Sequence, residues 1–308
     1  MKLNQIEYFV RVAELGSFTR ASLALAVSQP SLSRQIRLLE VELRQTLLYR
    51  NGRGVELTAE GHCFLEHGQA ILHAITRARG ALNDLRSDPR GRVVVGLPSR
   101  IAHVVTTPLV KAFRANFPHA AVSIAEGLSN VLHEWLLLGR VDLALLNDPP
   151  HSAELELDLI HSEELVLVGP RISHGSPEDI SLSQIEKYPL ILPRMPNATR
   201  AVLEEAVAKV GGKLHISMEV DTSGNILELV AGRMGFAVLP RGAVHNAGGN
   251  KRFHVMTIRP AVIQHLFLAV SKRRPDSRLT DKVAELIRKV DVPRLLEPDS
   301  VDSALATS

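Results

Sequence analysis

Polar side chains suited to nucleic-acid recognition gather on one face of a predicted helix that begins near residue 29. At about 100° per residue, these side chains fall between about 0° and 140° around the helix axis, and the apolar ones fall between about 280° and 340°. Gln and Arg can make paired hydrogen bonds to adenine and guanine edges, and short Ser side chains let the backbone approach phosphates. The pattern favours base recognition, and an ordinary amphipathic surface helix is the alternative. The polar face comprises Gln29, Pro30, Ser33, Arg34 and Arg37, opposite Leu32, Ile36, Leu39 and Leu43.

The positive charge of the chain is concentrated in this first segment. Residues 1–58 contain eight Lys or Arg and five Asp or Glu, an excess of three that equals the net charge of the whole chain. Such an excess suits an anionic partner, although an ordinary solvated surface gives the same count. Arg50 and Arg53 lie in and beside a Gly-rich turn, where we expect them to approach phosphates or the minor groove.

The elements that position these residues are predicted to be three helices and a two-stranded wing. A first helix ends at Gly16-Ser17, and a second covers about residues 18–26. Ser28 is the expected N-cap of a third helix that continues to about Leu43, with Pro30 close to its first position. Asn51–Gly54 has the composition of a hairpin turn. A polar helix after a short turn, in the net-basic segment, predicts a helix-turn-helix.

The next segment is predicted to be one long helix. Residues 58–85 contain no proline, and their apolar positions follow alternating steps of four and three. This heptad seam predicts pairing with a second copy of the chain, and burial on the helix's own domain is the alternative. The seam comprises Phe64, Gly68, Ile71, Ile75, Ala78, Leu82 and Leu85. We therefore assign residues 59–90 to a dimerisation helix and hinge that ends at Asp88-Pro89-Arg90-Gly91.

Beyond Gly91 the sequence pattern changes, and strand-like apolar runs alternate with amphipathic helical segments. This pattern predicts an α/β fold with a largely parallel sheet. A final helix over 279–290 precedes a tail, residues 293–308, that we expect to be mobile. The predicted strands are 93–96, 121–125, 142–146, 164–168, 190–192, 215–220, 236–239 and 265–270. The predicted intervening helices are 106–116, 130–138, 198–210 and 225–231.

The N-terminal segment resembles the LysR-type transcriptional regulators. The resemblance is carried by Phe9, Ala13, Gly16–Ser22, Leu25, Ser28–Ile36, Leu39-Glu40, Leu43, Leu47–Arg50 and Leu57–Gly61. Tyr49 departs from the family pattern, which usually has Phe there, and we expect no functional consequence. The resemblance adds Ser31 to the DNA-binding residues and continues more loosely to the C-terminus.

The resemblance implies a winged helix-turn-helix over residues 1–58 and an effector domain similar to a periplasmic binding protein. Subdomain I would comprise 91–162 with 267–292, and subdomain II would comprise 163–266, with a small-molecule cleft between them. The implied partners are double-stranded promoter DNA, a carboxylate effector and further copies of the chain. Dimers would form through 59–88 and tetramers by family likeness, and RNA polymerase is a further candidate partner.

Family positions for effector binding map most clearly onto Ser99 and Arg100. Ser99 follows a strand and opens a helix, where free N–H groups and the helix dipole favour a carboxylate, although simple capping is the alternative. Arg100 would clamp an anionic effector or pair with a surface carboxylate, and Arg194 has the same two interpretations. The remaining mapped positions are Asn147, Asn197, Thr222, Ser223 and Phe236.

An enzyme is the rival class, and the sequence offers little for it. The thirteen His include no HExxH pair, and GxSxG and GxxxxGK[ST] motifs are absent, so we expect no catalytic residue, metal or cofactor. Cys63 beside His62 is best interpreted as an ordinary packed cysteine. The first residues lack the apolar core of a signal peptide, and no apolar run approaches the roughly 20 residues that span a bilayer. We expect a cytoplasmic protein without a membrane partner, which also excludes an exported transport binding protein.

Overall fold

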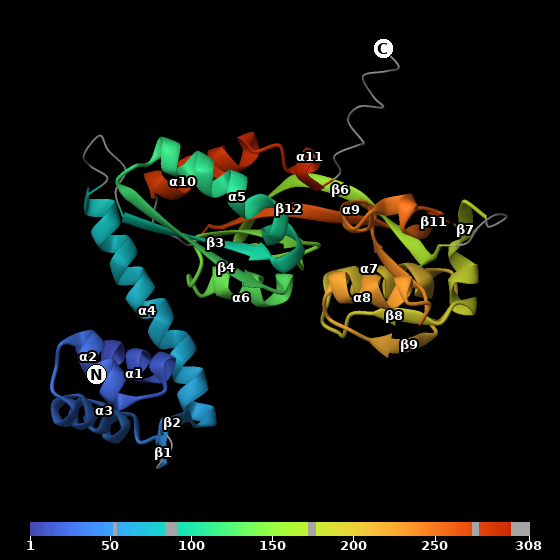
Figure 1. Ribbon diagram of the computed structural model, residues 1–308. Helices are drawn as coiled ribbons and strands as arrows, with labels where there is room; N and C mark the ends of the chain where they lie inside the picture. Colours follow the sequence, from blue (N-terminus) through green and yellow to red (C-terminus); the bar gives the residue numbers. More distant parts are fainter. Residues whose placement is uncertain (52–53, 84–90, 172–176, 273–276, 297–308) are drawn as a thin grey trace. The chain divides into compact units, whose positions relative to one another are not determined.

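The computed structural model describes residues 1–51, 54–83, 91–171, 177–272 and 277–296 (Figure 1). The chain divides into two units, residues 1–85 with 138–140 and residues 86–137 with 141–308. Each unit has its own apolar core. Within the described residues, no helix is both long and apolar enough to cross a membrane.

The N-terminal unit has the predicted three helices and wing. Its elements are α1 (Leu3–Leu15), α2 (Phe18–Leu25), α3 (Gln29–Leu43), β1 (Leu48–Asn51), β2 (Gly54–Leu57) and α4 (Ala59–Asn83). Ser17 Oγ accepts the backbone N–H of Arg20 and caps α2. The strands β1 and β2 pair antiparallel, with Leu48 opposite Leu57. Side chains from α1 and α3 meet in a core that contains Phe9, Leu32 and Ile36.

The heptad seam of α4 packs on its own unit over its first half. The Phe64 ring meets Phe9 edge to face, with ring centroids 5.2 Å apart. Gly68 lies against α1, where a Cβ would stand 3.0 Å from Val10 Cγ2. Ile75 is half-buried and Ala78 is exposed. Around Phe64 and Gly68 the seam therefore packs within its own unit. The Leu82 side chain and Leu85 lie outside the described part of the chain.

The C-terminal unit is built on one long mixed sheet. Its strand order is β4-β3-β5-β12-β6-β11-β7, and β10 also pairs with β6. The strands are β3 (Gly91–Pro98), β4 (Ala120–Gly127), β5 (Leu143–Asn147), β6 (Leu155–Pro170), β7 (Asp179–Ser181), β10 (Ala237–Pro240), β11 (Phe253–Arg259) and β12 (Ile263–Ser271). Parallel pairs join β3 to β4 and β5, and β7 to β11, whereas β12 runs antiparallel to both β5 and β6.

The prediction of a largely parallel sheet is therefore wrong. β10 and β11 are also antiparallel to β6, so one central strand is antiparallel to three neighbours. An apolar run indicates that a strand is buried, but it does not specify the direction of the adjacent strand.

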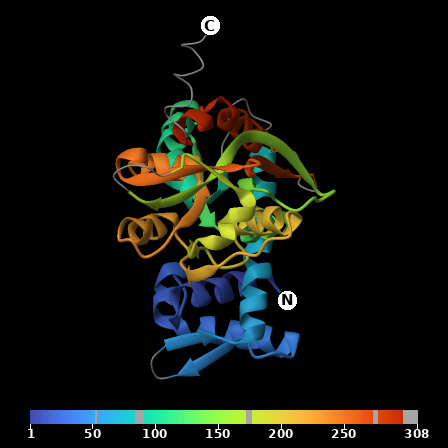
Figure 2. The same cartoon turned by 90° about the vertical axis from the view of Figure 1, so that its right-hand side faces the viewer.

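Helices cover both faces of the sheet (Figures 1 and 2). In the half that contains β3 and β5, α5 (Ser99–Asn116) and α10 (Arg278–Lys289) pack on one face, while α6 (Ser129–Leu137) packs on the other. The other half carries α7 (Ala198–Lys209), α8 (Ser223–Ala231) and α9 (Arg241–Asn246). There, β8 (Leu190–Leu192) and β9 (Ile216–Glu219) form a separate parallel pair.

The first residues of the predicted mobile tail, 293–296, are helical. Helix α11 (Val292–Leu296) follows α10 and buries Val292 and Leu296 in the core beside α5. Residues 297–308 lie outside the described residues.

Two strands connect the halves of the sheet. β6 pairs with β12 as far as Glu164 and with β10 from Leu165 onward. The predicted subdomain boundaries, 162/163 and 266/267, fall on β6 and β12. Each half therefore continues into the other through backbone that is already hydrogen-bonded.

Candidate functional site

The polar face predicted for DNA recognition is presented by α3. Ser28 Oγ accepts the backbone N–H of Ser31 at 3.4 Å and caps the helix, and Pro30 occupies its first turn. The apolar face is anchored by Leu32, Ile36 and Leu39, which are fully buried. The predicted residues exposed on the opposite side are Gln29, Pro30, Ser31, Arg34 and Arg37, with Ser33 half-buried. This arrangement leaves amide, hydroxyl and guanidinium groups available to a partner.

The wing beside α3 is held by a contact that sequence reasoning missed. Glu40 Oε1 accepts the backbone N–H groups of Leu47 and Leu48, at 2.9 and 3.2 Å. One carboxylate thus fixes the start of β1 against α3. Arg50 lies on β1, although its side chain is outside the described part of the chain, and Arg53 lies outside the described residues.

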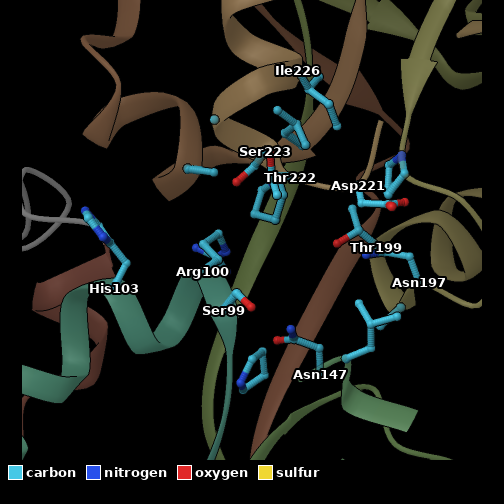
Figure 3. A pocket seen from close by; sticks show the side chains of 18 of the residues that line it. Ser99, Arg100, His103, Asn147, Asn197, Thr199, Asp221, Thr222, Ser223 and Ile226 are labelled. Carbon is cyan, nitrogen blue, oxygen red and sulfur yellow. The ribbon is translucent and has the colours of Figure 1, made fainter. Parts of the chain in front are cut away.

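The C-terminal unit contains a cavity of about 580 Å³ between the two halves of its sheet (Figure 3). Four helices of nine or more residues contribute their first turns or caps to its wall, namely α5, α6, α7 and α8. The predicted residues that line the cavity are Ser99, Arg100, Asn147, Asn197, Thr222 and Ser223. Backbone N–H groups at helix starts have no intrahelical acceptor and carry partial positive charge. The wall is therefore favourable to an anion.

Two predicted residues do not line the cavity. Arg194 is largely exposed and pairs with Asp221, with Arg194 Nε 3.1 Å from Asp221 Oδ1. The hydrogen bond from Arg194 lowers the pKa of the Asp221 carboxyl. The Phe236 ring packs edge to face on Tyr188, with centroids 4.7 Å apart, and lies over Gly169. Phe236 is thus part of the packing of its subdomain.

Other lining residues were not predicted from the sequence. They are His103, Leu128, Ser129, Thr199, Asp221 and Ile226, together with neighbouring apolar side chains. Ser129 is the first residue of α6 and Thr199 lies in the first turn of α7, so the helix-start signal that selected Ser99 was available for them. Asp221 belongs to the wall although sequence reasoning selected its partner Arg194.

Polar groups in the wall are fixed by hydrogen bonds from neighbouring elements. The Asn147 N–H donates to Ser129 Oγ at 3.0 Å, while Asn147 Oδ1 is buried without a partner among the described residues. Asn197 Oδ1 accepts the backbone N–H of Arg200 and caps α7. Thr199 Oγ1 donates to Gln264 Oε1 at 3.1 Å. The cavity therefore presents oriented donors and acceptors.

Arg100 makes the buried ion pair of this site. Its Nη2 donates to Glu163 Oε1, and the two side chains are 18% and 3% exposed. Arg100 lines the cavity, whereas Glu163 belongs to β6 and is not part of the wall. In the part of the chain that the structure describes, no cluster of His, Cys, Asp and Glu is arranged to hold a metal ion.

A winged helix-turn-helix unit and an α/β unit with a cavity between its halves define a DNA-binding regulator with a small-molecule binding domain. Residues 3–62 match the family described as "Bacterial regulatory helix-turn-helix protein, lysR family". Residues 86–291 match the "LysR substrate binding domain". The chain belongs to the LysR family of transcriptional regulators, and the resemblance inferred from its sequence is confirmed.

Similar proteins extend over almost the whole chain. The "Nitrogen assimilation regulatory protein nac" of Klebsiella aerogenes is 32% identical over 93% of this chain and 94% of its own length. Its counterpart in Escherichia coli K12 is 30% identical over 94% of this chain and 95% of its own length. Both full-length matches include the DNA-binding unit and the cavity unit.

Solved structures agree with this organisation. CbnR, described as a LysR family transcriptional regulator, is 25% identical, with a TM-score of 0.69 over 94% of this chain and 99% of its own. CbnR in complex with its target DNA is 26% identical, with a TM-score of 0.53 and the same coverage. Full-length OxyR from Pseudomonas aeruginosa, 22% identical with a TM-score of 0.68 over 94% of this chain and 98% of its own, shares the fold.

Proposed function

We propose that this regulator binds promoter DNA through α3 and its wing, and that an anionic small molecule in the cavity controls binding. The exposed polar face of α3 supports the proposal that the chain binds DNA. Arg34 and Arg37 project from a helix whose opposite face is fully buried, so the helix can enter a groove without loss of core contacts. The similar protein CbnR forms a complex with its target DNA, which supports the same role here.

The proposal that the chain binds DNA is tested with operator sequences that the full-length chain selects from a random library. Arg34→Ala should reduce affinity for the selected operator and relax the preference at one base pair, by roughly 1–3 kcal/mol of discrimination. Arg11→Ala is the matched control, because Arg11 is an exposed cation on α1 that pairs with Glu14. Unchanged affinity and base preference in Arg34→Ala would remove Arg34 from base recognition.

The anionic character of the effector is supported by the cavity wall. The helix starts at Ser99 and Ser223 lie on opposite halves of the sheet, and both reach the same cavity beside Arg100. Free N–H groups, helix dipoles and a guanidinium favour a carboxylate. Apolar side chains, among them Leu128 and Ile226, cover much of the remaining wall. We propose regulation rather than catalysis as the purpose of ligand binding.

A thermal-shift screen of small carboxylates against the full-length chain tests the proposal of an anionic effector. Operator binding is then measured in the presence of each hit. Ser99→Ala should weaken the response to a hit by roughly tenfold, because one polar contact at a helix start is worth about 1.4 kcal/mol. Ser183→Ala is the matched control, because Ser183 is an exposed serine that does not line the cavity. Chemical turnover of a hit would favour an enzyme instead.

Self-association through residues 59–88 stays part of the proposal. The half-buried Ile75 and the exposed Ala78 continue the seam beyond its packed first half. A partner helix would bury them. Ala78→Glu should shift the chain toward the monomer in sedimentation experiments, and an unchanged oligomer would exclude this face. Assembly into tetramers and contact with RNA polymerase are further candidate interactions.

A further inference from the structure

The ion pair beside the cavity is incomplete. Arg100 Nη2 bonds Glu163 Oε1, but Arg100 Nη1 and Glu163 Oε2 are both buried without a hydrogen-bond partner among the described residues. Guanidinium and carboxylate groups commonly pair through two parallel bonds, which would satisfy all four atoms. A buried polar group without a partner carries a desolvation cost. The pair therefore retains one unused donor and one unused acceptor.

The carboxylate of Glu163 is held in place by its surroundings. A Cβ on Gly242 would stand 3.1 Å from Glu163 Oε2 and 2.4 Å from the Leu296 carbonyl oxygen, so α9 and α11 approach closely there. Glu163 also lies on β6, where its backbone is in register with Gln264 of β12. Because Glu163 is confined and Arg100 lines the cavity, Arg100 is the member of the pair within reach of a ligand.

The charges around the cavity are balanced in pairs. Arg100 faces Glu163, and Asp221 in the wall faces Arg194. A ligand with one carboxylate can meet the accessible part of the Arg100 side chain, which is 18% exposed and lines the cavity, while the guanidinium keeps its bond to Glu163. A second negative charge would meet two carboxylates already in place, at Glu163 and Asp221. At an effective dielectric of about 20, a unit charge roughly 10 Å away changes affinity by about tenfold.

We propose that Glu163 is a specificity-determining residue that restricts the cavity to singly charged carboxylates with an apolar body. This inference rests on the proposed effector site and adds the charge and shape of its ligand. The apolar body follows from the side chains of Leu128, Ile226 and Leu239 in the wall. Glu163 does not line the cavity; its negative charge acts by reducing the net positive charge that Arg100 presents to a ligand.

The test uses the full-length chain and calorimetric titration with matched probes: hexanoate against adipate, and benzoate against phthalate. The wild-type chain should bind at least one monocarboxylate more tightly than its dicarboxylate partner. Glu163→Gln, which keeps the side-chain shape, should raise affinity for dicarboxylates by roughly a hundredfold and for monocarboxylates by roughly tenfold, so that the selectivity is lost. Glu164→Gln is the matched control, because the adjacent Glu164 pairs with Arg241 instead.

Each outcome distinguishes the two proposals. Tighter binding of adipate or phthalate by the wild-type chain, or an unchanged selectivity in Glu163→Gln, overturns the role of Glu163 and leaves an anionic effector in place. Failure of all four probes to bind overturns the carboxylate ligand itself. Where Glu163→Gln fails to fold, Glu163→Met, a neutral side chain of similar volume that leaves Arg100 in place, should show the same loss of selectivity. Retained selectivity in that folded variant also overturns the proposal.

Discussion

Gly61 of α4 lies so close to Leu47 that a Cβ on the glycine would stand 2.0 Å from the Leu47 carbonyl oxygen. The Gly61 N–H also donates to Thr58 Oγ1 at 2.9 Å, which fixes the first turn of α4. Gly61→Ala should therefore push α4 away from the wing and destabilise the N-terminal unit by at least roughly 2 kcal/mol. Urea unfolding measures this, with the exposed neighbour His62→Ala as control. If Gly61→Ala and the wild-type chain were equally stable, the close approach of Gly61 to Leu47 would not require a glycine.

Glu40 should contribute more to stability than its neighbour Glu42 does. Glu40→Ala removes the acceptor for two backbone N–H groups at the start of β1, at a cost of roughly 1.5–3 kcal/mol. Glu42, which is half exposed, pairs with the terminal ammonium, and Glu42→Ala should change stability by less than about 0.5 kcal/mol. Thermal unfolding of the two variants gives the comparison. A larger loss from Glu42→Ala would contradict it.

Arg53 is expected to contribute charge and little sequence information. Arg53→Ala should weaken binding to selected and random duplexes by a similar factor, and should lower the slope of log affinity against log salt by about 0.9. Fluorescence anisotropy at several salt concentrations measures both quantities. A loss confined to one operator sequence would instead assign Arg53 to base recognition.

Asp148 should make the stability of the C-terminal unit fall with rising pH. Burial raises the pKa of its carboxyl, and the hydrogen bond from the His265 N–H offsets only part of that rise. The folded state therefore keeps a proton that the unfolded chain has already released. Between the ordinary aspartate pKa and the raised value, the free energy of unfolding decreases as pH increases.

The Asp148→Asn variant lacks this titration. Relative to the wild-type chain, it should gain stability as the pH rises through the same window, as measured by urea unfolding from about pH 4 to pH 7. Asp179→Asn, at an exposed site near Arg259, is the control. Parallel curves for Asp148→Asn and the wild-type chain would exclude the effect.

Most of the longer helices could be predicted because their signals are local, whereas the short helices α9 and α11 were missed. Ser17 and Ser28 cap α2 and α3 as expected, and the apolar positions of α3 face the core. Most of the predicted strands were identified from nearly continuous apolar residues. β6 was therefore expected to start at Glu164, although it begins at Leu155 with leucines that alternate with acidic residues over 155–159. That alternation was the available signal, whereas three-residue β7 offers almost none.

The cavity was predictable only in part, for a physical reason. Helix-start residues such as Ser99 and Thr222 can be identified from the local sequence, and they line the cavity. The pairing of Arg194 with Asp221 joins residues 27 positions apart, and that of Arg100 with Glu163 joins residues 63 apart. Such pairings depend on tertiary contacts. Whether an arginine faces a ligand or a carboxylate therefore required the structure.

The passage of β6 and β12 between the two halves of the sheet has a mechanical consequence. At Glu163 and Gln264 the two strands are in register, so both connections lie within one hydrogen-bonded ladder. The halves cannot open as two lobes on independent tethers; they must rotate about this ladder by twisting it. A few degrees of twist beside Arg100 would be magnified with distance along each half. Rotation of this kind would convert the occupancy of the cavity into displacement at the far end of each half.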